Sequence, residues 1–190
     1  MNREFTKEYS KKFIEDFEEL RIEDIENISN AIWQAYLEGN HILIMGNGGS
    51  ASIASHFACD LGKAASDKDK PRFRVQSMND NIPMLTAFAN DYGYENVFIE
   101  QLKNLANAND VVIAISSSGN SENMVRAIDY ANKINATTIA ITGFGGGKIS
   151  KTAKIKLILN STDFGIVETI HMFACHILAF GFRERFEKRV

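Results

Sequence analysis

Residues 41–50, His-Ile-Leu-Ile-Met-Gly-Asn-Gly-Gly-Ser, place a short apolar run directly before a glycine-rich turn. Such a run, ended by glycine, predicts a buried parallel strand. Residues 111–121, VVIAISSSGNS, repeat the arrangement with serines in the turn. Further strand-like runs at 73–76, 137–142 and 155–159 alternate with helical stretches. This alternation predicts an α/β fold, a three-layer doubly wound sheet of about five parallel strands with helices on both faces.

Helices are expected between these strands and at both ends of the chain. They cover residues 49–63, 84–90, 96–105, 122–134, 148–152 and 165–185. The charged segment 65–74 contains Pro71 and is expected to be a loop. Residues 1–38 carry apolar side chains at helical spacing, which predicts a helical N-terminal arm or hairpin with a break near residues 20–23. The apolar stripe of the arm leaves open whether it packs on its own core or, in an oligomer, on a second subunit.

Composition limits the classes of partner. The chain has 190 residues, 45% apolar and 24% charged, which suits a single domain over residues 1–190. Its 21 Lys and Arg face 24 Asp and Glu, so it lacks a broad basic field for nucleic acid or an anionic membrane. Two cysteines, Cys59 and Cys175, are too few for a disulfide scaffold and fit a reducing compartment. With neither a signal peptide's apolar centre nor an apolar run of about 18 residues, we expect a cytoplasmic protein without nucleic-acid or membrane partners.

The first glycine-rich turn, residues 45–50, follows the strand predicted at 41–45. Its glycines let the backbone approach a ligand and leave amide donors facing outward where the next helix begins. Neither a dinucleotide-binding glycine pattern nor a nucleoside-triphosphate loop occurs, so no nucleotide cofactor is expected. Taken alone, the turn is equally consistent with anion binding and with a merely tight strand-to-helix connection.

The second turn, residues 116–121, reads Ser-Ser-Ser-Gly-Asn-Ser and precedes a predicted helix. An ordinary serine N-cap needs only one hydroxyl, whereas this turn supplies four. Hydroxyl donors, backbone donors and a helix N-terminus together favour a phosphate. Because neither turn contains Lys or Arg, neutral donors would hold that phosphate.

Ionisable side chains interrupt two of the predicted helices. His56 and Asp60 are four residues apart, so they lie on one helix face and can bind a metal, move protons or simply hydrogen-bond to each other. Glu168, His171 and His176 interrupt the otherwise apolar last helix. Buried ionisable groups are costly unless they are paired or functional.

Four segments together resemble sugar isomerase (SIS) domains, specifically the phosphoheptose isomerases. They are GNGGSASIASHFACDLGK from Gly46, LTAFANDYGYENVF from Leu85, AISSSGNSENMVRA from Ala114 and TGFGGGK from Thr142. The likeness runs in collinear order from about residue 32 to 180. It implies a flavodoxin-like SIS domain, conversion of sedoheptulose 7-phosphate to D-glycero-D-manno-heptose 7-phosphate for bacterial surface polysaccharide (lipopolysaccharide or capsule), a homotetramer, and zinc as one divalent metal per active site.

The resemblance also implies roles for single residues. Metal ligands would be His56, Asp60, Glu168 and His176, of which Asp60 is also the catalytic carboxylate and His176 the catalytic acid. Residues expected at the sugar phosphate are Asn47, Gly48, Gly49, Ser50, Asp60, Asn90, Asp91, Ser116, Ser117, Ser118, Ser121 and Glu168. His171 matches a recurrent histidine without an obvious role. Two residues depart from the family pattern, because Asp60 stands where Glu is usual and Glu168 where Gln is usual.

Helix geometry bears on this ligand set. Residues eight apart on a helix lie about 12 Å apart along its axis, so Glu168 and His176 share one ion only through long reaches, a helix irregularity or a neighbouring subunit. An active site built between subunits, in the homotetramer that the resemblance implies, would fit this constraint. Isomerisation through an enediol needs a carboxylate base, for which Asp60 is the first candidate and Glu168 its rival, and an acid such as His176.

Two other functions remain open at this stage. Related domains serve as non-catalytic scaffolds, including one that associates with the bacterial replication initiator, or sense phosphosugars. Another phosphosugar isomerase, or a lyase acting on amino sugars, would share the phosphate turn but need different groups around the reacting carbons.

Overall fold

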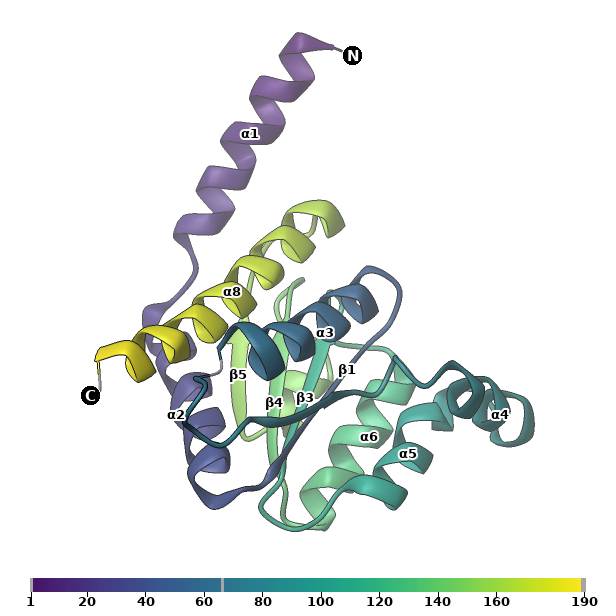
Figure 1. The fold of residues 1–190 in the computed structure, drawn as a ribbon. Coiled ribbons are helices and arrows are strands. Elements are labelled where there is room, and N and C mark those ends of the chain that lie inside the picture. Colours follow the sequence, from purple (N-terminus) through teal and green to yellow (C-terminus); the bar gives the residue numbers. More distant parts are fainter. Residues whose placement is uncertain (1, 66, 189–190) are drawn as a thin grey trace.

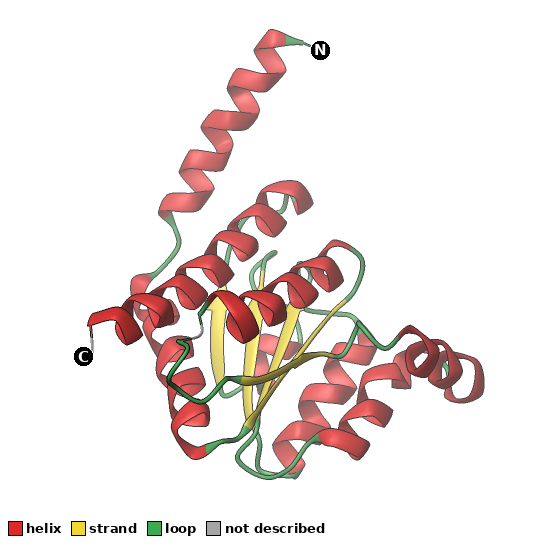
Figure 2. Ribbon diagram, viewed as in Figure 1, coloured by secondary structure: helices red, strands yellow, loops and turns green. Residues whose placement is uncertain are grey.

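The computed structural model describes residues 2–65 and 67–188, and its centre is a parallel sheet (Figures 1 and 2). The strands are β1 His41–Gly46, β2 Arg74–Ser77, β3 Val111–Ser116, β4 Thr137–Thr142 and β5 Ile155–Ile158. Their order is β2-β1-β3-β4-β5, and every neighbouring pair is parallel. The predicted doubly wound sheet of five strands is confirmed. The expected arm, loop and 1–190 domain each include residues outside the described part.

The strand order creates a switch point between β1 and β3. The chain leaves β1 for β2 on one side and leaves β3 for β4 on the other. Strands β1 and β3 are in register, with Ile42 opposite Val111 and Gly46 opposite Ile115. Their carboxyl ends therefore lie side by side, and ligands of open α/β sheets bind at this position.

Helices cover both faces of the sheet and make the expected three layers (Figure 1). One face packs against α2 Ile22–Glu38, α3 Gly49–Cys59 and α8 Phe164–Lys188, and the other against α5 Val97–Leu105 and α6 Glu122–Lys133. Alternate residues of β1 serve the two layers, because Ile42 and Ile44 belong to the first core and Leu43 and Met45 to the second. This explains why the strand is apolar throughout rather than alternating.

The N-terminal arm forms two helices with a break at residues 19–21, close to the predicted break. Helix α2 buries Ile28 and Ile32 against the sheet of its own chain. Helix α1, Arg3–Glu18, has no buried residue and projects from the body (Figure 1). It leaves Phe5 60% and Ile14 55% exposed. The arm is thus divided: α2 belongs to the core, whereas α1 packs against the body along one side, through Tyr9, Phe13 and Phe17, and leaves its other side exposed.

The remaining elements are short or interrupted. The helix expected at 49–63 ends as α3 at Cys59 and continues as a π-helical turn, η1 Asp60–Ala64. Beyond β2 lie α4 Ile82–Tyr92 and the 3₁₀ turn η2 Tyr94–Asn96, and α7 Ile149–Thr152 precedes β5. By length and composition alone α8 is able to cross a membrane, but nine of its residues are buried in the protein, and a core helix has the same composition.

Candidate functional site

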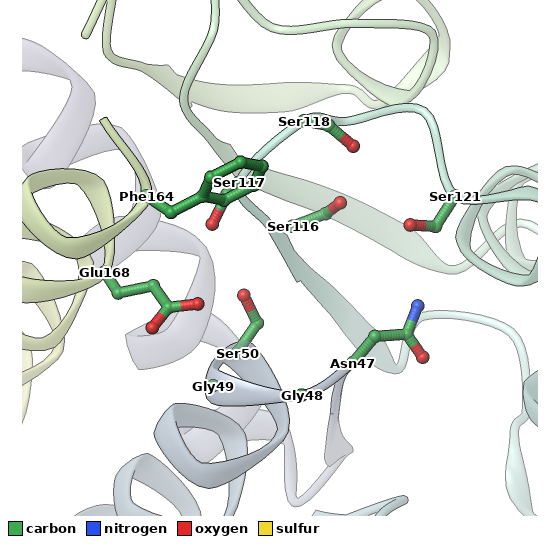
Figure 3. A pocket seen from close by; sticks show the side chains of 10 residues that line it. All are labelled: Asn47, Gly48, Gly49, Ser50, Ser116, Ser117, Ser118, Ser121, Phe164 and Glu168. Carbon is green, nitrogen blue, oxygen red and sulfur yellow. The ribbon is translucent and has the colours of Figure 1, made fainter. Parts of the chain in front are cut away.

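A pocket of about 260 Å³ opens at the β1/β3 switch point (Figure 3). It is lined by Asn47, Gly48, Gly49, Ser50, Ser116, Ser117, Ser118, Ser121, Phe164 and Glu168. The two turns singled out from the sequence thus form its walls, and Glu168 reaches it from α8. Phe164 is the one lining residue that sequence reasoning did not name.

The turn after β1 depends on its glycines. Gly48 has a φ of +55°, in the region that favours glycine, and a Cβ on Gly46 would lie 2.2 Å from the Ser50 carbonyl oxygen. Helix α3 begins at Gly49, directly at the pocket. The Asn79 side chain extends the sheet ladder here, since its Oδ1 accepts from Gly46 N at 3.0 Å and its Nδ2 donates to Gly46 O at 2.9 Å.

The serine turn keeps hydroxyls available for a ligand. Ser121 occupies the N-cap position of α6, yet its side chain makes no capping hydrogen bond. The Ser117 hydroxyl is buried and has no partner within the described part of the chain. An unpartnered buried polar atom is costly unless a ligand or water completes it. Together with the N-terminus of α6, these hydroxyls form a cradle suited to a phosphate.

Glu168 brings a carboxylate into this otherwise neutral pocket. Its oxygens lie over Gly49, close enough that no Cβ fits between them. Within residues 2–65 and 67–188 it has no hydrogen bond or ion pair. A carboxylate without a partner at a pocket wall is able to take a proton from a bound molecule.

Three donor atoms converge beside the pocket. Nε2 of His56 lies 3.1 Å from Nε2 of His176 and 3.3 Å from Oδ2 of Asp60. Nε2 of His176 lies 3.6 Å from the same oxygen. Donors bound tetrahedrally to one zinc at about 2.05 Å lie about 3.3 Å from one another. The spacing of the three atoms is therefore compatible with donors to one zinc ion.

Three elements bring these donors together. His56 is on the last turn of α3, Asp60 opens η1, and His176 is on α8. The π-helical turn is wider than an α-helical one, and such turns recur at functional sites. Two imidazoles and a carboxylate suit zinc, although the same contacts also describe a histidine–aspartate hydrogen-bond cluster.

Glu168 is not part of this donor group. The atoms that lie within 4.8 Å of one another come from His56, Asp60 and His176 only, among the described residues. The wide axial separation expected for residues 168 and 176 accounts for this arrangement. A groove lies next to the pocket and is lined by Ile53, Gly165, Glu168, Thr169, Met172, Phe173 and His176. It shares Glu168 with the pocket and His176 with the donor group.

Asn90 and Asp91, also expected at the sugar, lie elsewhere. Both are exposed at the end of α4, and the Asn90 amide donates to the Asp91 carboxylate at 2.8 Å. Neither lines the pocket of its own chain.

Two ionisable side chains of α8, His171 and Cys175, are buried in the core. His171 is fully buried, and burial lowers its pKa to about 4, against a weaker opposing effect of the Thr142 backbone. Neither of its ring nitrogens makes a well-formed hydrogen bond. Burial also raises the pKa of the Cys175 thiol. His171 is therefore neutral near pH 7, and Cys175 stays a thiol.

Sequence reasoning missed the side chains that support the pocket, notably Asn79, Tyr94 and Asn123. Asn123 is 3% exposed and exchanges hydrogen bonds with Asn47. The sequence does place the amide of Asn123 in the first turn of the helix after the serine turn. Its partner Asn47 can be identified only when β1 and β3 are known to be neighbours.

Comparisons with known proteins show which family the chain belongs to. The family model described as SIS domain matches residues 5–143. The phosphoheptose isomerase of Aquifex aeolicus is 37% identical over 85% of this chain and 84% of its own. That of Helicobacter pylori strain 26695 is 42% identical over 72% and 71%. The structure of a phosphoheptose isomerase from Francisella tularensis superposes with a TM-score of 0.90 at 25% identity, covering 97% of this chain and all of that one.

Proposed function

The chain belongs to the SIS-domain family and, within it, to the phosphoheptose isomerases, and from this membership we propose that it converts sedoheptulose 7-phosphate to D-glycero-D-manno-heptose 7-phosphate. The observation that carries the proposal is the placement of an unpartnered carboxylate between a serine-lined anion cradle and a three-donor group. The product would supply heptose to a bacterial lipopolysaccharide or capsule.

The substrate's phosphate would lie in the serine turn. Its oxygens would meet the hydroxyls of Ser117 and Ser121 and the amide donors at the start of α6. Ser50 and the glycine turn close the opposite wall. Anchoring the phosphate far from the reacting carbons uses its binding energy to position them.

Glu168 is our choice of base, ahead of Asp60. Aldose–ketose isomerisation moves a proton between C1 and C2, with a carboxylate serving carbon and an acid serving oxygen. Asp60 faces two imidazoles at 3.3 and 3.6 Å, whereas Glu168 has no such partner and lies in the pocket. His176, at the far end of the groove from the phosphate cradle, would exchange the proton on oxygen.

His56, Asp60 and His176 would hold one zinc ion. When bound, zinc would polarise the substrate's carbonyl and stabilise negative charge on its oxygen. Asp60 then acts as a ligand, which gives Glu168 the free carboxylate role. This division gives separate roles to the two carboxylates, Asp60 on η1 and Glu168 on α8.

A homotetramer with active sites between subunits is the expected assembly. In the single chain α8 leaves Phe173 40%, Ile177 40% and Phe180 47% exposed, next to the groove that holds His176. Apolar side chains grouped in this way favour burial against another subunit. Asn90 and Asp91, which do not line their own pocket, would be free to serve a neighbouring one.

The test is turnover of sedoheptulose 7-phosphate by the purified protein, followed by separation of the product heptose phosphate. Glu168→Gln is expected to lower kcat by about 10²–10⁴-fold, the loss typical of a missing general base. Asp60→Asn should be rescued in part by excess zinc, because it weakens a ligand. Absence of turnover with zinc present, from a folded protein that still binds phosphosugars, would favour a scaffold, a sensor or another substrate.

A further inference from the structure

Two asparagines join the two turns of the pocket. Nδ2 of Asn47 donates to Oδ1 of Asn123 at 2.9 Å, and Nδ2 of Asn123 donates to Oδ1 of Asn47 at 3.0 Å. The Tyr94 hydroxyl, from η2, also donates to Oδ1 of Asn47 at 2.8 Å. Asn47 follows β1 and Asn123 is in the first turn of α6, so the pair spans the β1/β3 switch point.

These contacts determine what Asn47 offers to a ligand. A side-chain amide has two acceptor positions on oxygen and two hydrogens on nitrogen. Both acceptor positions of Asn47 are taken by Asn123 and Tyr94, and one hydrogen is given to Asn123. A single N–H remains. In Figure 3 the nitrogen of Asn47 points toward the side of the pocket that holds Ser121, and its oxygen points away.

We propose that Asn123 and Tyr94 are positioning residues that hold Asn47 as a hydrogen-bond donor to an oxygen of the sugar phosphate. The inference rests on the proposed function. The atom recognised is an acceptor, a carbonyl, hydroxyl or phosphate oxygen, and a substrate with an ammonium group at this place would meet a second donor. Asn123 does not line the pocket and acts through Asn47.

The charge of the pocket makes the orientation of the Asn47 amide important for ligand binding. In the described part of the chain no Lys or Arg lines the pocket, while Glu168 adds negative charge. Neutral N–H and O–H donors must therefore stabilise the anionic ligand. If the amide of Asn47 rotated, its oxygen would face that ligand and repel it.

A double-mutant cycle on kcat/KM for sedoheptulose 7-phosphate tests the assignment. Asn123→Ala is expected to lower kcat/KM about tenfold, the scale of one hydrogen bond, and to have little further effect in an Asn47→Ala background. Asn132→Ala is the matched control, because Asn132 is also on α6 but its hydrogen bonds lie away from the pocket. Its Oδ1 accepts from the Thr138 hydroxyl at 2.8 Å, and its Nδ2 donates to the Thr152 carbonyl at 3.0 Å. This control should lose stability without losing kcat/KM. An equal loss from Asn123→Ala in both backgrounds would overturn the inference.

A second readout does not depend on turnover. In NMR spectra of the wild-type protein, the Asn47 side-chain amide proton that is donated to Asn123 should exchange slowly with solvent. Inorganic phosphate or sedoheptulose 7-phosphate should shift the signal of the other amide proton. Asn123→Ala should abolish the protection, and Tyr94→Phe should reduce it. Unchanged Asn47 signals in both variants would refute the positioning role, whereas protected signals in a protein without turnover would refute only the proposed function.

Discussion

The carboxylate of Glu168 lies against the Cα of Gly49, so closely that a Cβ at position 49 would fall 2.2 Å from its Oε2. This contact places the one acidic side chain that lines the pocket, among the residues that the structure describes, directly over the N-terminus of α3. It ties α8 to the turn after β1, and a side chain at position 49 would displace the Glu168 carboxylate.

Substituting Gly49 should therefore disable the enzyme through Glu168. Gly49→Ala forces the carboxylate out of its position, and we expect kcat/KM to fall at least about tenfold, as for a misplaced catalytic group. Steady-state kinetics on sedoheptulose 7-phosphate measures the effect. Gly181→Ala on α8 is the control, because a Cβ there meets nothing within 4 Å. Full activity of Gly49→Ala would argue against the placement of Glu168.

Ser121 should contribute to substrate binding more than to folding. Its side chain does not cap α6, so Ser121→Ala should cost less than the roughly 1 kcal/mol typical of a lost N-cap while raising KM. Asn81, whose side chain accepts from Met84 N at 3.1 Å, does cap α4, and Asn81→Ala should show the full stability loss. Thermal unfolding and KM, measured on both variants, separate the two effects. A large stability loss with unchanged KM in Ser121→Ala would contradict the phosphate cradle.

Zinc binding should require His56 and His176. Calorimetry is expected to show one zinc per chain, with binding weakened at lower pH because the imidazoles must lose their protons. His56→Gln should abolish it. His41→Gln should not, since His41 is 3.7 Å from Asp110 and outside the donor group. Equal zinc affinity in His56→Gln and the wild type would show that this donor group does not bind zinc.

Burial of neutral His171 should make stability depend on pH. Its pKa is about 4 in the folded state against 6.5 when unfolded, so between these values the unfolded state binds more protons. The unfolding free energy should therefore fall as pH is lowered from about 6.5 to 4, by roughly 3 kcal/mol at about 1.4 kcal/mol per pH unit. Urea unfolding across this range should show that contribution missing in His171→Gln, in which residue 171 does not titrate. Parallel curves for the two proteins would show that His171 does not remain neutral.

The sequence predicts the fold because its strands and turns are locally encoded. The uniform apolar runs of β1 and β3 identify buried parallel strands, and the glycine and serine turns mark the ends where ligands bind. Helical periodicity also separates α1 from α2 near the observed break. These features depend only on neighbours along the chain.

Two kinds of feature were not predictable: local irregularities of a helix and contacts between residues far apart in the sequence. Periodicity predicts an unbroken helix through Asp60, because a π-helical turn leaves no separate mark in a short apolar pattern. The amide pair of Asn47 and Asn123 joins residues 76 positions apart. The sequence likewise allows Glu168 to be a metal ligand or the catalytic base. Only the structure shows that Glu168 lies over Gly49 and outside the donor group.

The most direct test of the central claim is NMR of sedoheptulose 7-phosphate incubated with the zinc-loaded protein in deuterium oxide. Proton transfer through an enediol predicts heptose 7-phosphate that carries solvent deuterium at C2. The Glu168→Gln variant should not form this labelled product. Failure of the folded, zinc-loaded protein to form any heptose 7-phosphate would contradict the account.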